Sequence, residues 1–296
     1  MHHKMRAARP GRLSIRPMIR LAVTLVLLSL FNCAPGHVVQ GRPYELEVPA
    51  DAGSGPLPLV ILLHGYSGNG FAQNFIFPFS SEVDSRRFLY ALPDGSRDAV
   101  GKRFWNATDA CCNFGKLQID DVGFLRALIA DVKASHAVDP ARIFLIGHSN
   151  GGFMALRMAC EASDLVTGVV SIAGAAALPM PTCPGPAIPV LQIHGTADET
   201  IPYLGGNTGA LGAEFPSAIV TAQGYAARNG CSQTRTAGDP LDLVGDSTAE
   251  TTRDVFDACP AKARVELWTV DGATHLPAFN SAWPGRVIDW LQESVK

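Results

Sequence analysis

A serine between two glycines is the group in this chain most suited to covalent chemistry. Residues 147–151 read Gly-His-Ser-Asn-Gly, so Ser149 is the centre of a G-x-S-x-G pattern. The preceding stretch, 142–146, predicts a strand, and 153–159 contains good helix formers. On such a sharp strand-to-helix turn the hydroxyl stands above the sheet, and flanking glycines avoid a steric clash. We therefore predict that Ser149 is a nucleophile that attacks an acyl carbon.

A serine nucleophile needs a base, and only His194 and His275 follow it in the chain. Asp198 lies shortly after His194, and His275 comes after a further predicted strand, 265–270. The order serine, acid, histidine suits an acyl-transfer triad, so we expect His275 to be the base and Asp198 to orient it. Asp198 as a turn cap is the alternative. For His194 a structural role at a strand end is preferred.

Negative charge on the acyl oxygen requires backbone N–H donors close to the serine. One is expected from Asn150, the residue after the nucleophile. The other is expected from Tyr66, in the loop after an apolar strand predicted at 57–63. This glycine-containing loop lacks the spacing of a phosphate-binding loop.

Four residues are expected to contact the substrate. They are His64, Gly65, Trp105 and Tyr203. In the loop after 57–63, Gly65 lets the backbone approach the substrate closely. Trp105 is interpreted as a pocket wall, with a loop-anchoring role as the alternative.

Composition limits the class of protein. The chain has 296 residues and a net charge of −3, with no basic block in its body, which argues against a nucleic-acid partner. Strand and helix signals alternate without a linker or repeat. We predict one catalytic domain over 37–296, a mostly parallel sheet flanked by helices. No cofactor or metal is expected, because the cysteine and histidine spacing does not suit zinc.

Periodicity predicts several further elements. Residues 44–48 alternate in polarity and predict an antiparallel edge strand. Buried strands are expected at 88–92 and 166–172. A helix capped by the Asp pair at 120–121 and a closing helix containing 287–291 complete the prediction.

The N-terminus predicts export. Arginines precede the apolar stretch 21–31, which is too short for a stable membrane span and has the layout of a secretory signal. We expect residues 1–36 to be a signal peptide, and the mature protein to be secreted into the extracellular space or periplasm. Lipid attachment at Cys33 and a buried N-terminal helix are the alternatives.

Six cysteines remain after such cleavage, and an even number suggests a disulfide framework. They are Cys111, Cys112, Cys160, Cys183, Cys231 and Cys259. We expect Cys231 to pair with Cys259 across a polar stretch. The adjacent pair at 111–112 is expected to reach the other two, because a bond between neighbours closes a strained ring. Buried free thiols are the alternative.

Several short motifs together resemble those of secreted polyhydroxybutyrate depolymerases and feruloyl esterases. They are LLHGY at 62–66, WNA at 105–107, CC at 111–112, DDVGFL at 120–125, GHSNGG at 147–152, ACE at 159–161, IHGTAD at 193–198 and NGC at 229–231. The resemblance covers most of the chain after residue 40. It implies an α/β-hydrolase fold and carboxylic-ester substrates: hydroxyalkanoate polymers or oligomers, or acylated plant polysaccharides. After His275, Leu276 and Pro277 replace the tryptophan-containing sequence that the family often has.

Two other functions share some of these features. A prolyl-oligopeptidase-like peptidase has the same elbow and chain order, but such enzymes usually carry a propeller domain, for which this chain has no room. A non-catalytic hydrolase fold used for binding is the other, and the intact Ser149, Asp198 and His275 argue against it. The leading hypothesis is a serine carboxylesterase that works through an acyl-enzyme.

Overall fold

The structure, a computed structural model, describes residues 1–2, 37–207, 213–245, 249–260 and 263–295. The predicted signal peptide, apart from its first two residues, lies outside this range, as does Cys33. The elements below belong to one unit, Gly36–Lys296. The helices are α1 Gly70–Ile76, η1 Phe79–Glu82, α2 Val83–Arg86, α3 Asp121–Ser135, α4 Asn150–Glu161, α5 Ala218–Arg228 and α6 Trp283–Ser294. The strands are β1 His37–Val39, β2 Arg42–Glu47, β3 Leu57–Leu63, β4 Leu89–Pro93, β5 Ser96–Arg97, β6 Arg103–Phe104, β7 Val138–His148, β8 Gly168–Ile172, β9 Val190–Gly195, β10 Gly206–Asn207, β11 Glu214–Phe215, β12 Arg235–Leu241, β13 Thr251–Phe256 and β14 Val265–Val270.

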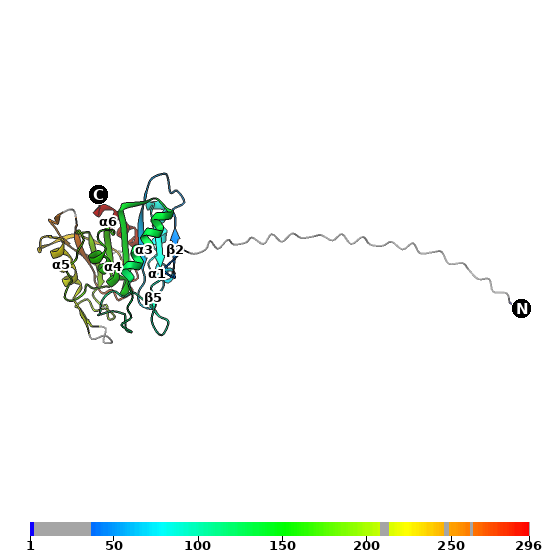
Figure 1. Ribbon diagram of the computed structural model, residues 1–296, viewed down its shortest axis with the longest axis horizontal. Helices are drawn as coiled ribbons and strands as arrows, with labels where there is room; N and C mark the ends of the chain where they lie inside the picture. The colour runs from blue at the N-terminus through cyan, green and yellow to red at the C-terminus, as the bar shows by residue number, and fades with distance from the viewer. Residues whose placement is uncertain (3–36, 208–212, 246–248, 261–262, 296) are drawn as a thin grey trace. The chain divides into compact units, whose positions relative to one another are not determined.

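A ten-stranded sheet runs through the unit in the order β1-β2-β4-β3-β7-β8-β9-β14-β13-β12. Figure 1 shows the strands of the unit together with its helices. Strands β4, β3, β7, β8, β9 and β14 are parallel, and antiparallel strands extend both edges. This confirms the mostly parallel sheet with flanking helices. The prediction that 44–48 is the edge strand is wrong, because β1 pairs outside β2. Strand β1 has only three residues, which are too few to show alternating polarity in the sequence.

Alternation along β3 divides the core into two layers. Leu59, Ile61 and Leu63 face a layer that contains the buried sides of α3, α4 and α5. Val60 and Leu62 face a second layer built from η1, α2 and α6. Every residue of β3 is buried, as expected of a central parallel strand covered on both faces.

The hairpin of β12 and β13 was not predicted, because its strands are polar. β13 pairs with β14 along its whole length. Arg253 on β13 reaches across to Glu266 on β14 with a 2.9 Å ion pair, and the Trp268 indole donates to the same carboxylate. This carboxylate is buried but fully paired, so a polar strand fits at this edge.

Three disulfides form, and one predicted pairing is confirmed. Cys231 bonds to Cys259, closing the segment that contains the hairpin. The prediction that 111–112 bonds to the other two is wrong: Cys160 pairs with Cys183, and Cys111 pairs with Cys112. Cys160 is in the last turn of α4, and its Cα lies 4.7 Å from that of Cys183. Sequence separation carries no information on such a distance.

Candidate active site

Ser149 stands at the junction of β7 and α4, at the carboxyl edge of the parallel strands. Its φ of 55° lies in the left-handed region, where a non-glycine residue is strained. Strand pairing holds this turn from below, since Ser149 N donates to Ile172 O at 2.8 Å. Both flanking glycines are required sterically. A Cβ on Gly147 would overlap backbone atoms of Gly151, and a Cβ on Gly151 would overlap backbone atoms of Leu63. The sharp elbow predicted from the sequence is therefore present.

Asp198 and His275 meet at the same edge. His275 Nδ1 lies 2.7 Å from Asp198 Oδ2, which fixes the proton on Nδ1 and leaves Nε2 able to accept one. The other carboxylate oxygen accepts the N–H groups of Thr200 and Ile201, both at 2.8 Å. Asp198 is thus both the turn cap considered above and a partner of the histidine.

The Asp198 carboxyl is nearly buried, and burial alone would raise its pKa. Hydrogen bonds from His194 and His275 and from the Ile201 N–H outweigh burial and lower the pKa below its usual range. His194 Nε2 lies 3.4 Å from the carboxylate and 2.8 Å from Ile201 O. His194 therefore buttresses the acid loop, in keeping with the structural role preferred for it.

The contact between Ser149 and His275 is indirect in this structure. Among the described residues, the Ser149 hydroxyl donates no hydrogen bond to His275. His148 joins the two, because its ring centroid lies 4.8 Å from that of His275. Catalytic hydrogen bonds are often long without substrate and tighten when it binds. The complete triad remains a prediction.

The loop after β3, residues 64–69, is called the oxyanion loop here. Gly65 N donates to Gln73 Oε1 at 2.9 Å, and His64 Nδ1 donates to Gly65 O at 2.7 Å. His64 Nε2 accepts from Gly95 N, which assigns the ring proton to Nδ1. In a trans peptide the carbonyl and the following N–H point in opposite directions, so holding Gly65 O also orients Tyr66 N–H.

Two free donors remain near the serine. Tyr66 N–H has no backbone or side-chain acceptor among the described residues. Asn150 N–H is in the first turn of α4, where N–H groups lack partners within the helix. Both predicted oxyanion donors are therefore available for a ligand oxygen.

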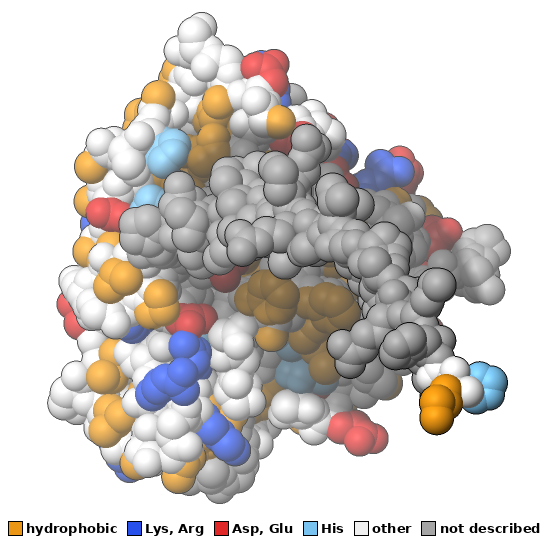
Figure 2. Space-filling view, turned by 90° about the vertical axis from the view of Figure 1, so that its right-hand side faces the viewer, with side chains coloured by type: hydrophobic (Ala, Val, Ile, Leu, Met, Phe, Trp, Pro, Cys, Tyr) orange, Lys and Arg blue, Asp and Glu red, His pale blue; other side chains and the backbone are white. Residues whose placement is uncertain are grey.

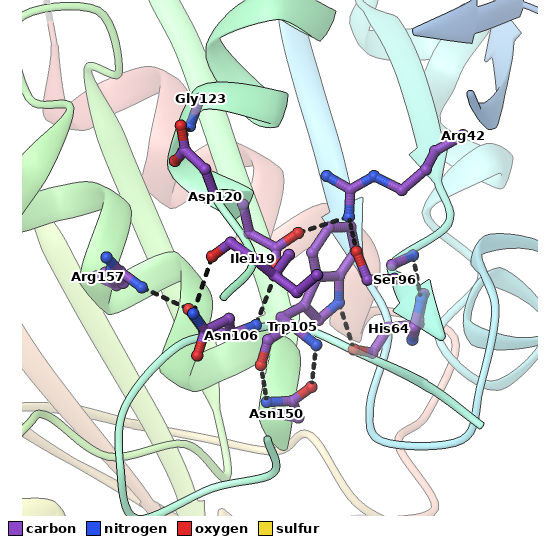
Figure 3. A network of polar contacts seen from close by, with 12 residues as sticks. Arg42, His64, Ser96, Trp105, Asn106, Ile119, Asp120, Gly123, Asn150 and Arg157 are labelled. Carbon is purple, nitrogen blue, oxygen red and sulfur yellow. Dashed lines mark hydrogen bonds and ion pairs between the residues drawn. The ribbon is translucent and has the colours of Figure 1, made fainter. Parts of the chain in front are cut away.

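The Asn150 side chain and Trp105 were not assigned these contacts from the sequence. Asn150 pairs with both polar backbone groups of Trp105, at 2.6 and 2.9 Å, and the Trp105 indole donates to His64 O at 3.0 Å (Figure 3). Trp105 thus ties the oxyanion loop to the elbow. No signal marks this, because the residue after the serine varies freely in the G-x-S-x-G pattern.

Two expected substrate contacts need correction. The Trp105 side chain is completely buried, which favours loop anchoring over a pocket wall. His64 is also completely buried, with both ring nitrogens bonded to backbone, so it acts on Gly65 rather than on substrate. Gly65 itself lies against Ser149, since a Cβ there would sit 3.3 Å from Ser149 Cβ. Tyr203 bonds Thr269 through its hydroxyl at 2.9 Å, and its ring packs on His194.

Comparison with known proteins identifies the family of this chain. The chain is 30% identical over 263 residues to NocK of Nocardia uniformis subsp. tsuyamanensis, a protein named as an esterase, covering 84% of this chain and 73% of NocK. The chain belongs to the α/β-hydrolase family of carboxylic ester hydrolases. Residues 119–211 match the family model described as Phospholipase/Carboxylesterase.

More distant relatives of this esterase carry substrate names. Feruloyl esterase C of Emericella nidulans is 28% identical over 75% of this chain and 72% of its own length. Poly(3-hydroxyalkanoate) depolymerase C of Paucimonas lemoignei is 26% identical over 51% of this chain, which spans 34% of that protein. The acetyl xylan esterase from Aspergillus awamori shares the fold, with a TM-score of 0.60 at 13% identity over 85% of this chain and 94% of that one.

Exposed apolar side chains occur on helix α1, which follows the oxyanion loop, and on the residue after His275. Helix α1 leaves Phe71 and Phe75 exposed, and Leu276 beside the histidine is also exposed. Phe77, the residue directly after α1, packs on the ring of His148. We call Phe71, Phe75 and Leu276 the apolar rim. On the face drawn in Figure 2, charged side chains of both signs lie among hydrophobic ones.

A polar groove lies beyond Trp105. It has a volume of about 860 Å³ and is lined by Thr108, Asp109, Lys116, Arg157 and Glu214, among others. Ser149 is not part of its lining. Asn106 O accepts from Arg157 and connects the groove to the segment that holds Asn150.

Within the described residues, no helix is both long and apolar enough to cross a bilayer. In the same part of the chain, no three His, Cys, Asp or Glu side chains gather as metal ligands would.

Proposed function

We propose that this esterase is an exported serine hydrolase in which Ser149, His275 and Asp198 form the catalytic triad. The observation that carries the proposal is the 2.7 Å Asp198–His275 bond at the strand edge that also carries Ser149 on its strained turn. This is the arrangement that a serine needs to become a nucleophile.

The reaction then follows from the assigned atoms. Ser149 Oγ attacks the acyl carbon while His275 Nε2 takes its proton. The negative oxygen that forms accepts hydrogen bonds from Tyr66 N–H and Asn150 N–H. Collapse breaks the ester C–O bond, and the imidazolium returns the proton to the alcohol. Water repeats the sequence on the acyl-enzyme and releases the acid.

The substrate class is proposed from the relatives' names together with the site. Feruloyl esterases and a hydroxyalkanoate depolymerase are among the relatives. The apolar rim suits an aromatic or aliphatic acyl chain, and the groove suits a polar alcohol portion, so feruloyl esters of carbohydrates and hydroxybutyrate oligomers are the candidates.

The test compares four substrates with wild type and Ser149→Ala: nitrophenyl butyrate, methyl ferulate, a hydroxybutyrate oligomer and a prolyl-peptide anilide. Ester turnover is expected, with a fall of about 10⁶-fold in the variant. Cleavage of the anilide without ester cleavage would assign a peptidase instead. A folded protein inactive on all four would indicate a binding role.

Export is proposed on two grounds: the basic and apolar N-terminus, and the three disulfides. Mass spectrometry of the protein from the culture fluid and periplasm of a bacterial host is expected to find a chain that starts near residue 37. Retention of radioactive palmitate on Cys33 would indicate a lipoprotein instead.

A further inference from the structure

His148 is a buried histidine with no part in the proposed triad. It directly precedes the nucleophile in the chain, and its ring centroid is 4.8 Å from that of the proposed base, His275. Its Nε2 is 2.9 Å from the backbone carbonyl of His275. On its other side, the ring of Phe77 packs edge-on at 5.1 Å.

The partners of His148 define its protonation. A carbonyl oxygen only accepts, so Nε2 carries the proton and Nδ1 is bare. A Cβ added to Gly65 would lie 3.3 Å from Nδ1, so this nitrogen faces the oxyanion loop. Burial, and then the charge of nearby His275, lower the pKa of His148 to about 3. The hydrogen bond to the His275 carbonyl and the charge of Asp198 oppose this shift, and His194 adds slightly to it. His148 therefore stays neutral when His275 takes a proton.

His275 has few other restraints. The histidine loop, residues 271–282, links β14 to α6 without a helix or strand of its own. Near its start, Thr196 N donates to Val270 O, and Ala197 N donates to Ala273 O. At its end, Asn280 N donates to Leu243 O. Phe279 forms an isolated β-bridge with Val244 and stacks on Trp283, with 3.7 Å between the ring centroids. Among the described residues 274–277, hydrogen bonds form only at His275. One holds its ring to Asp198, and the other holds its backbone to His148.

These two bonds have different consequences. The Asp198 bond fixes the ring tautomer but allows the ring and its backbone to swing together about the carboxylate. The His148 bond ties that backbone to the residue next to Ser149. We infer that His148 is a positioning residue for the proposed reaction: it holds the His275 backbone at a fixed place relative to the serine, so that Nε2 faces the hydroxyl. This inference rests on the proposed function.

Three variants test the inference. His148→Leu removes the donor, and His148→Gln keeps an N–H that reaches the carbonyl. His136→Gln, at a half-buried position directly after α3, controls for loss of a histidine. With nitrophenyl butyrate, kcat is expected to fall between about 10- and 100-fold for His148→Leu, with KM nearly unchanged. His148→Gln should recover most of kcat, and His136→Gln should match wild type.

Two further measurements separate positioning from misfolding. Near-UV circular dichroism should show that the variants keep native packing. The rate at which diethyl nitrophenyl phosphate inactivates the enzyme needs the same base, and it should fall by the same factor as kcat. A folded His148→Leu with wild-type kcat would overturn the inference, as would a folded His148→Gln as slow as His148→Leu.

The downfield proton resonance of His275 Nδ1 keeps this inference distinct from the proposed function, because it is measured without turnover. In His148→Leu this signal should shift or broaden, whereas His136→Gln should leave it unchanged. If the wild-type protein turned over no ester but the resonance still shifted in His148→Leu, only the proposed function of the triad would be refuted. Normal turnover in Ser149→Ala would do the same. An unshifted resonance would refute positioning by His148.

Discussion

The oxyanion loop and the histidine loop flank the same serine but are held in different ways. Gly65 is hydrogen-bonded at both its N–H and its carbonyl, and the Trp105 indole holds the preceding residue, His64. Around His275, by contrast, two hydrogen bonds carry the positioning, and the next residue is exposed. Donors that stabilise developing charge gain from being fixed in advance. The base is therefore the part of the site most sensitive to loss of a single contact.

The largest test of this comparison is Asp198→Asn. An amide preserves the shape but favours the wrong imidazole tautomer, so we expect kcat to fall about 10⁴-fold with the fold intact. Steady-state kinetics with nitrophenyl butyrate would measure it. Asp131→Asn makes the same change on α3, outside the proposed triad, so it is the matched control and should retain activity. An Asp198→Asn enzyme within tenfold of wild type would remove the acid from the proposed triad.

A second test asks whether both loops are independent of the outer hairpin. Replacing Cys231 and Cys259 together by serine opens a disulfide that spans 28 residues, which should lower the free energy of unfolding by about 3–4 kcal/mol. Urea unfolding would measure it, with kcat at 20 °C as the companion value. We expect kcat to stay near wild type; a large loss would show that the hairpin contributes to positioning the site.

The third test varies the pH and compares His64, which holds the oxyanion loop, with His148, which contacts the histidine loop. The pKa of His64 is lowered to about 4 and that of His148 to about 3, chiefly by burial. The unfolded chain therefore takes up protons below pH 6.5 that the folded chain refuses, so stability falls as pH drops from 6.5 to about 4. The two together give a slope of about 2.7 kcal/mol per pH unit in that window.

Urea midpoints across this pH range would measure that slope, and His148→Gln should reduce it by about half. Stability that stays flat between pH 6.5 and 4 would contradict the neutral, buried state of both rings.

The smallest expected effect is in the oxyanion loop. Gln73→Leu removes the acceptor of Gly65 N–H, but His64 and Trp105 still hold the loop, so kcat should fall by less than about tenfold. Gln73→Glu, which keeps an acceptor, is the paired variant and should be less affected. A loss for Gln73→Leu as large as that for His148→Leu would show that the two loops are held equally well.

Local patterns predicted the elements that position the site. The strand predicted at 57–63 matches β3. The elbow, the acid loop and the histidine after β14 follow the ends of strands, as predicted. Such features depend on periodicity and turn chemistry, both of which are local. This is why the Asp198–His275 pair could be anticipated without any alignment.

Features that depend on distance through space could not be predicted in the same way. The β12–β13 hairpin is polar and is stabilised by pairing with β14. Asp121 was expected only as a helix cap, but it is buried and forms a 2.5 Å ion pair with Arg42. His148 and the Asn150 side chain also matter through partners distant in sequence. Residue type alone does not identify those partners.

The pairing of Asn150 with the Trp105 backbone has a practical consequence. It clamps the entrance of the 105–119 segment to the nucleophile's helix, and Asn106 and Asp121 secure the next peptide. Beyond that clamp, positions such as Asp109, Lys116 and Gln118 face solvent. Libraries randomised there should yield altered alcohol preference while sparing turnover, which makes this stretch the natural starting point for redesign.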